Sequence, residues 1–140
     1  MGRSTLLQWN FWDIKQTEEI DLLILMFNLL VLVQETYFKN VNISLFRKYI
    51  FYNKIGSVIE NKASGGVAIM VNKSIYLSDI NLNTKLQAVA VRASIPKATT
   101  ICSIYLLPNF HSETKHLKEV MAQLLPPFIL MGDFNAHSNL

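Results

Sequence analysis

The sequence has a single cysteine, few charged residues and no apolar run long enough to span a bilayer. Cys102 is the only cysteine in the 140 residues, which excludes a disulfide framework and a cysteine zinc site and suits a reducing, intracellular compartment. The longest apolar run, Leu22 to Val33, is broken by Asn28 and is well short of the about 20 residues that a transmembrane helix needs. We therefore expect neither a membrane partner nor a disulfide partner.

Charge is sparse and unevenly placed. Charged residues make up 16% of the chain and apolar residues 51%. The charged fraction is low for a soluble domain, as expected if part of the polar surface of the domain is missing from the sequence. The net charge is +3, and the excess is concentrated between Lys39 and Lys62, where aromatic residues interleave with lysines. Such a stretch can follow a nucleic-acid backbone. On this feature alone we favour the simpler interpretation, a solvated loop and edge strand.

Hydrophobic periodicity predicts strands mixed with two helices. The helices are expected at Thr17–Phe27 and Glu113–Leu125, and the strands at Thr5–Trp9, Leu29–Val33, Val67–Val71, Leu86–Ile95, Thr100–Leu107 and Phe128–Met131. In the second helix the apolar spacing places one stripe on a single face, made of Leu117, Val120, Met121, Leu124 and Leu125. In the strand Leu86–Ile95, alternation places Val89, Val91, Ala93 and Ile95 together. This order predicts an α/β layered sandwich with mixed sheets.

Polar residues that suit phosphoester chemistry stand where the predicted strands end. They are Asn10, Glu35, Tyr105, Asn109, Asp133 and Asn135. Each has an ordinary explanation on its own, since Glu35 could be a solvated edge residue, Tyr105 a core residue and Asp133 part of a turn. Because sites in α/β folds assemble at strand ends, their joint occurrence favours a metal-dependent phosphoester site.

The motifs that carry these residues resemble the endonuclease/exonuclease/phosphatase superfamily, and most closely the endonuclease domain of jockey-type non-LTR retrotransposons. The matching segments are Gln8-Trp9-Asn10, Gln34-Glu35-Thr36, Gly65-Gly66-Val67, Leu86 to Arg92, and Gly132-Asp133-Phe134-Asn135-Ala136-His137. The resemblance implies a DNase I-like four-layer α/β/β/α sandwich. Residues 1–140 would form one domain lacking its C-terminal part, because the Ser-Asp-His-type motif that completes the family's site is absent from the sequence.

The resemblance also implies a role for each site residue. Glu35 and Asn10 would hold Mg²⁺, or Mn²⁺ in its place. Asp133, Asn135 and Tyr105 would be the catalytic residues, with Asp133 positioning or deprotonating the attacking water. Asn109 and Asn135 would bind the phosphate of the substrate.

The implied function is nicking of target DNA in the nucleus, to expose a 3′-hydroxyl for a reverse transcriptase domain in the parent polyprotein. Two alternatives stay open: a phosphatase or phosphodiesterase of the same superfamily, and a degenerate, non-catalytic fragment or nucleic-acid-binding remnant. For the 140-residue product we favour lack of activity, because half of a catalytic constellation seldom keeps the required geometry. Departures such as Phe11-Trp12-Asp13 after Asn10 favour the same view.

An incomplete sandwich should also expose apolar strand faces. We expect such exposure at Val89, Val91, Ile101 and Leu106, and therefore a marginally stable, aggregation-prone chain.

Overall fold

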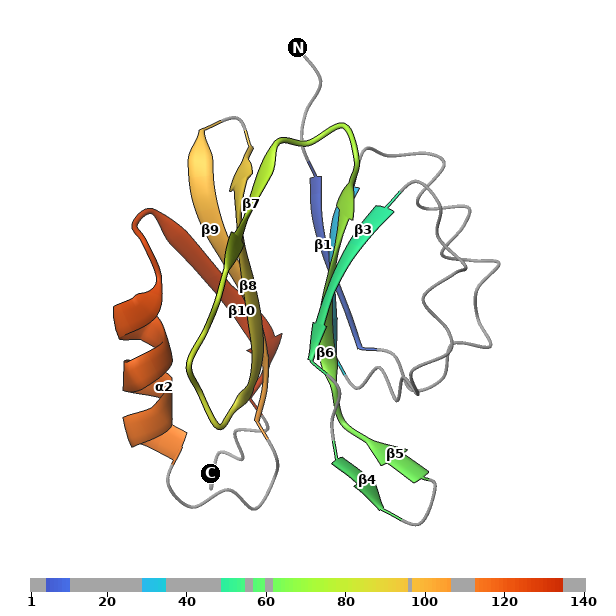
Figure 1. The fold of residues 1–140 in the computed structure, drawn as a ribbon, viewed down its shortest axis with the longest axis vertical. Helices are drawn as coiled ribbons and strands as arrows, with labels where there is room; N and C mark the ends of the chain where they lie inside the picture. Colours follow the sequence, from blue (N-terminus) through green and yellow to red (C-terminus); the bar gives the residue numbers. More distant parts are fainter. Residues whose placement is uncertain are drawn as a thin grey trace, which may run out of the picture.

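The structure is a computed structural model. It describes residues 5–10, 29–34, 49–54, 57–59, 62–95, 97–106 and 113–134. Within these ranges two four-stranded sheets pack face to face, and a helix covers the outer face of one of them (Figure 1).

The first sheet, here named the N-terminal sheet, has the strand order β1-β2-β6-β3. Its strands are β1 (Thr5–Asn10), β2 (Leu29–Gln34), β3 (Tyr49–Lys54) and β6 (Val67–Asn72). β1 and β2 are parallel, whereas β6 is antiparallel to both β2 and β3. A short hairpin of β4 (Ser57–Ile59) and β5 (Lys62–Ser64) leads into β6. Gly65 and Gly66 join β5 to β6 with φ of 71° and 96°, a backbone region in which glycine carries no steric penalty.

The second sheet, here named the C-terminal sheet, has the strand order β10-β9-β8-β7. Its strands are β7 (Leu77–Ile80), β8 (Gln87–Ser94), β9 (Ala98–Tyr105) and β10 (Phe128–Asp133). β7, β8 and β9 form an antiparallel meander. α2 (Glu113–Gln123) then connects β9 to β10, and these two strands are parallel. This is the crossover by which a helix returns the chain to the same edge of a sheet.

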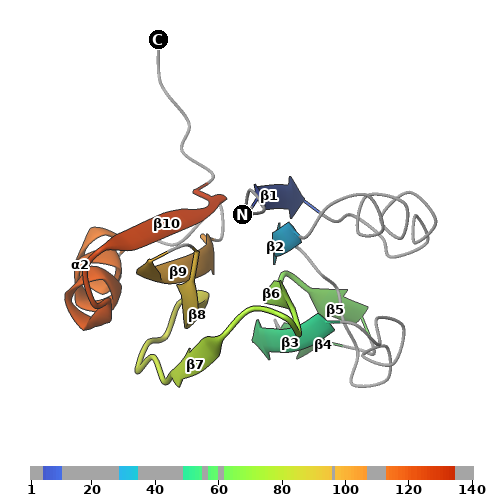
Figure 2. The same cartoon turned by 90° about the horizontal axis from the view of Figure 1, so that it is seen from above.

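Two apolar cores hold the layers together. The core between the sheets is centred on Ile69, Val71, Val91, Ala93 and Ile101. The core between the C-terminal sheet and α2 is centred on Leu86, Ala88, Ala90, Cys102, Ile104, Leu106, Val120 and Leu124. Figure 2 shows the resulting order of α2, C-terminal sheet and N-terminal sheet. In β8 the odd-numbered residues face the N-terminal sheet and Ala88 and Ala90 face the helix, as strand alternation requires.

The predicted strands are confirmed with shifts of a few residues at their ends, and so are the mixed sheets and the helix that begins at Glu113. Three layers of the expected four-layer sandwich lie in the described ranges, while the predicted helix Thr17–Phe27 lies outside them. β7 and the β4–β5 hairpin were not predicted, and for β3 only an edge strand without bounds was expected between Lys39 and Lys62. In the part of the chain that the structure describes, no helix is long and apolar enough to cross a membrane.

Two expectations about side chains were wrong. Exposure was expected at four residues, but Val91, Ile101 and Leu106 are 0%, 1% and 3% exposed and Val89 is partly buried. The N-terminal sheet covers Val89, Val91 and Ile101, and Leu106 belongs to the α2 core.

The apolar stripe of α2 is also narrower than predicted. Met121 is 40% exposed and Leu125 58%, since Val120 and Leu124 fill the contact with the sheet and Leu125 lies beyond the end of the helix. β10, predicted as a buried strand, is only partly buried, and Ile129 is 41% exposed.

Candidate active site

The carboxyl ends of four strands meet at one end of the sandwich, here named the carboxyl edge. β1 and β2 end there in the N-terminal sheet, and β9 and β10 end there in the C-terminal sheet (Figure 1). The two sheets are joined at this edge by a hydrogen bond in which Gln8 Nε2 donates to the carbonyl oxygen of Gly132 at 3.1 Å. The edge thus brings together residues from both ends of the described chain.

In the C-terminal sheet, three neighbouring strands contribute one residue each to a row along this edge. Asp133 pairs with Tyr105, and Tyr105 pairs with Gln87. All three have odd numbers, and on these strands Val89, Ile101 and Met131 belong to the core between the sheets. Because side chains alternate along a strand, the row faces the N-terminal sheet.

In the N-terminal sheet, the register gives a matching row of backbone positions. Asn10 pairs with Gln34, Gln34 with Val67, and Val67 with Lys54. Glu35 is the residue directly after β2 in the sequence. Glu35 itself and the side chain of Asn10 lie outside the described parts. The register therefore pairs Asn10, the last residue of β1, with Gln34, the residue that precedes Glu35 in the chain.

Asp133 is held at the end of β10 by close packing of the backbone. Its carbonyl oxygen accepts a hydrogen bond from Leu106 N at 2.9 Å. The preceding residue, Gly132, lies so close to β9 that a Cβ there would be 1.8 Å from the carbonyl oxygen of Ile104. Only glycine lets the two strands approach this closely, so Gly132 sets the position from which Asp133 projects.

Tyr105, the last residue of β9, is 7% exposed. It lies between Gln87 and Asp133 in the row, in register with both. Its burial is compatible with a core role and with a phenol placed at the mouth of the site. The other two predicted site residues, Asn109 and Asn135, lie outside the described ranges.

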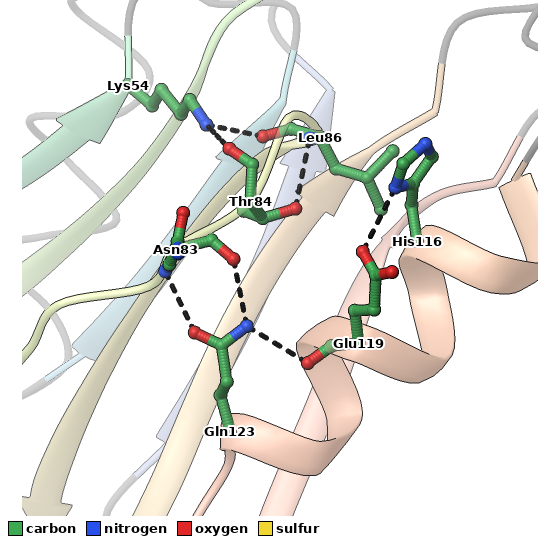
Figure 3. A network of polar contacts seen from close by, with 7 residues as sticks. All are labelled: Lys54, Asn83, Thr84, Leu86, His116, Glu119 and Gln123. Carbon is green, nitrogen blue, oxygen red and sulfur yellow. Dashed lines mark hydrogen bonds and ion pairs between the residues drawn. The ribbon is translucent and has the colours of Figure 1, made fainter.

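Two further residues at this edge were not predicted from the sequence. Gln87 Oε1 accepts a hydrogen bond from Gly66 N, which ties β8 to the start of β6. Lys54 Nζ donates to the carbonyl oxygens of Thr84 at 2.9 Å and Leu86 at 2.6 Å (Figure 3). Burial lowers the pKa of the Lys54 ammonium below its ordinary value, because loss of water disfavours the charged form.

Alternation could have found Gln87, since it lies two residues before Val89 and so shares its face. The role of Lys54 could not be found in this way, because the end of β3 and the segment before β8 meet only in the folded chain.

The residue types at this edge fit a hard divalent cation. Carboxylate and amide oxygens are the ligands that Mg²⁺ prefers, with several waters retained. Asp133 provides a carboxylate in the described part of this edge, while the two ligands expected from the resemblance, Glu35 and the side chain of Asn10, lie outside the described parts. Among the side chains that the structure describes, no group of three or more His, Cys, Asp or Glu residues gathers into a metal cluster.

Two comparisons with known proteins give matches, one with a family model and one with solved structures. The sequence model of the "Endonuclease/Exonuclease/phosphatase family" matches residues 7–140. The fold is similar to the solved "Endonuclease domain of TRAS1, a telomere-specific non-LTR retrotransposon", with a TM-score of 0.62 and 20% sequence identity. That match covers 95% of this chain and 59% of the TRAS1 domain, so the chain spans well under two thirds of the longer structure. No curated protein matches the sequence significantly.

Proposed function

The chain belongs to the endonuclease/exonuclease/phosphatase family, and we propose that its carboxyl edge is the first part of a divalent-metal-dependent DNA endonuclease site that hydrolyses phosphodiester bonds. In the parent element this site would nick target DNA in the nucleus, ahead of a reverse transcriptase domain. The similarity of the fold to a retrotransposon endonuclease domain supports the choice of DNA as substrate.

One observation carries the proposal. The strand register places Asp133 beside Tyr105 in one sheet and Asn10 beside the strand end that leads to Glu35 in the other. The hydrogen bond from Gln8 to Gly132 brings these two pairs to the same end of the sandwich. A phosphodiester bound at that edge would meet a carboxylate, a phenol and an amide from different strands, which is the arrangement that in-line hydrolysis needs.

The chain's own residues would divide the work. Glu35 and Asn10 would hold the metal, which when bound offsets the negative charge of the phosphate oxygens. The carboxylate of Asp133 would orient the attacking water and accept its proton. The Tyr105 hydroxyl would donate to a phosphate oxygen, and the amides of Asn109 and Asn135 would hold that phosphate in place.

The test is nicking of supercoiled plasmid by the full-length parent protein with Mg²⁺ or Mn²⁺, because we favour lack of activity for the 140-residue chain by itself. We expect the Asp133→Asn variant to lose activity by about 10²–10⁴-fold, the usual contribution of a positioned general base. Glu119→Gln is the control, because Glu119 is an exposed acid on α2, outside the carboxyl-edge rows, and its ion pair with His116 lies within that helix.

Three results would overturn the proposal. Equal nicking by Asp133→Asn would remove Asp133 from the mechanism. Release of phosphate from soluble inositol phosphates without any DNA nicking would move the chain to the phosphatases of the same family. Absence of both activities in the wild-type parent protein would leave this site without a catalytic role.

A further inference from the structure

Gln87 occupies a position in the carboxyl edge that the proposed chemistry does not use. It is the first residue of β8, it is partly buried, and it pairs in register with Tyr105. Its side chain crosses to the other sheet, where Oε1 accepts a hydrogen bond from Gly66 N. Gly66 is buried and directly precedes Val67, which pairs with Gln34 at the end of β2.

Gln87 thus connects the two halves of the proposed site through a short path. On one side, a single step across the β8–β9 pair leads to Tyr105, and the next step leads to Asp133. On the other side, the bond to Gly66 leads through Val67 to the strand end before Glu35.

The space around this bond is tight. A Cβ on Gly65 would lie 2.5 Å from Gln87 Oε1. The double glycine therefore lets the turn close over the amide, and Gly65 adopts the left-handed φ that this requires. An acceptor enclosed between two sheets and met by a backbone N–H has few alternative positions, because leaving that N–H unpaired costs about 1–3 kcal/mol.

The chain contains a second glutamine that makes similar bonds elsewhere. Gln123 on α2 accepts from Asn83 N at 2.8 Å and donates to the carbonyl oxygens of Asn83 at 2.9 Å and Glu119 at 3.0 Å (Figure 3). These bonds tie the helix to the β7–β8 loop and do not cross between the sheets. Replacing Gln123 therefore measures the effect of losing glutamine hydrogen bonds that hold a loop but do not link the two halves of the site.

We infer that Gln87 is a positioning residue, which sets the separation of the two sheets at the carboxyl edge and thereby the distance from Tyr105 and Asp133 to the Glu35 strand end. The inference rests on the proposed function for its catalytic consequence. Its structural consequence, a local opening of that edge when the bond is lost, does not depend on activity.

The experiment compares the wild-type chain with three variants. Gln87→Met removes the acceptor at similar volume, and Gln87→Glu keeps an acceptor oxygen for Gly66 N. Gln123→Met makes the same chemical change at the loop and serves as the matched control. Amide hydrogen exchange is measured by NMR on the 140-residue chain, and steady-state plasmid nicking is measured on the full-length parent protein carrying the same substitution.

Hydrogen exchange decides the positioning role independently of nicking. In Gln87→Met we expect at least about fivefold faster exchange at Gly66 and also at Leu106, whose N–H bonds to the carbonyl of Asp133, because about 1 kcal/mol of stabilisation is lost locally. Thr100 N, which bonds to Pro127 O at 2.9 Å at the far end of the same strand, should be unchanged. Faster exchange at Gly66 alone would overturn the inference.

The kinetic readout separates positioning from general stabilisation. We expect Gln87→Met to lower kcat by about 10–100-fold with KM within about twofold, since a displacement near 1 Å misaligns reacting groups without removing a phosphate contact. Gln87→Glu should remain near wild type, and Gln123→Met should lower Tm while leaving kcat unchanged. Wild-type kcat in Gln87→Met would refute the inference. Absence of nicking in the wild type would refute the proposed function, with the exchange data still deciding the role of Gln87.

Discussion

Replacing Gly132 with alanine tests whether close contact between β9 and β10 positions the proposed site. The new Cβ would lie 1.8 Å from Ile104 O, 2.7 Å from Ile104 C and 2.8 Å from Ile104 Cγ2, whereas Cβ contacts under 3.0 Å essentially never occur. The nearest atoms belong to the backbone of a central strand, which cannot rotate out of the way. β10 must therefore move from β9 by more than an ångström.

The expected cost follows from that displacement. Overpacking a well-packed strand interface costs typically about 1–3 kcal/mol, and backbone obstruction places this site at the upper end. A loss of about 3 kcal/mol corresponds to roughly 10 °C in Tm for a domain of this size. The same shift moves Asp133, so we expect nicking to fall about 100-fold beyond any loss of folded protein.

Urea unfolding followed by circular dichroism measures the loss of stability. Plasmid nicking by the full-length parent carrying Gly132→Ala, at a temperature where the variant is folded, measures the loss of activity. Ser78→Thr is the control, because it adds a methyl group to an exposed position in β7. A Gly132→Ala protein with a Tm within about 2 °C of wild type, or with unchanged nicking, would show that the strands tolerate the added atom and refute the reasoning.

Two further predictions concern the α2 layer and its core. Val120→Ala should destabilise the chain by about 2 kcal/mol, because Val120 is fully buried against the C-terminal sheet; Met121→Ala, at a residue 40% exposed, should cost under about 1 kcal/mol in the same urea titration. Burial raises the pKa of the Cys102 thiol from 9.0 to about 12, so the native state keeps a proton that the unfolded chain loses between those values. The free energy of unfolding should therefore fall as pH rises through that window. At pH 8, iodoacetamide should alkylate Cys102 only as fast as the chain opens, and rapid labelling of the folded protein would contradict this.

The sequence predicted the parts of the fold that depend on local pattern. Alternation placed Val89, Val91 and Ala93 on one face because a strand has a period of two wherever it lies. The polar residues after predicted strands marked the ends of β1, β9 and β10 correctly. The apolar spacing of α2 was less informative, since the width of the stripe is set by how the helix lies on the sheet.

The relation between strands could not be obtained in this way. Nothing near Gln87 in the sequence indicates that it accepts a bond from Gly66, and nothing near Gln8 indicates Gly132. These pairs depend on which strands become neighbours, which is decided by packing over the whole chain. The roles assigned to the six site residues stay predictions that the proposed nicking assays address; the residues are Asn10, Glu35, Tyr105, Asn109, Asp133 and Asn135.

The hydrogen bond between Gln8 and Gly132 joins residues 124 positions apart in the sequence, and this has a consequence for the order of folding. Contacts of such long range form slowly, because the entropy of closing the intervening loop must be overcome before they contribute any stability. The β7–β8–β9 meander can pair locally. β1 cannot meet β10 until β10 has been synthesised and the α2 connection has brought it alongside β9. Formation of the carboxyl edge should thus be among the last events in folding, and a kinetic probe placed at Gly132 would time its completion.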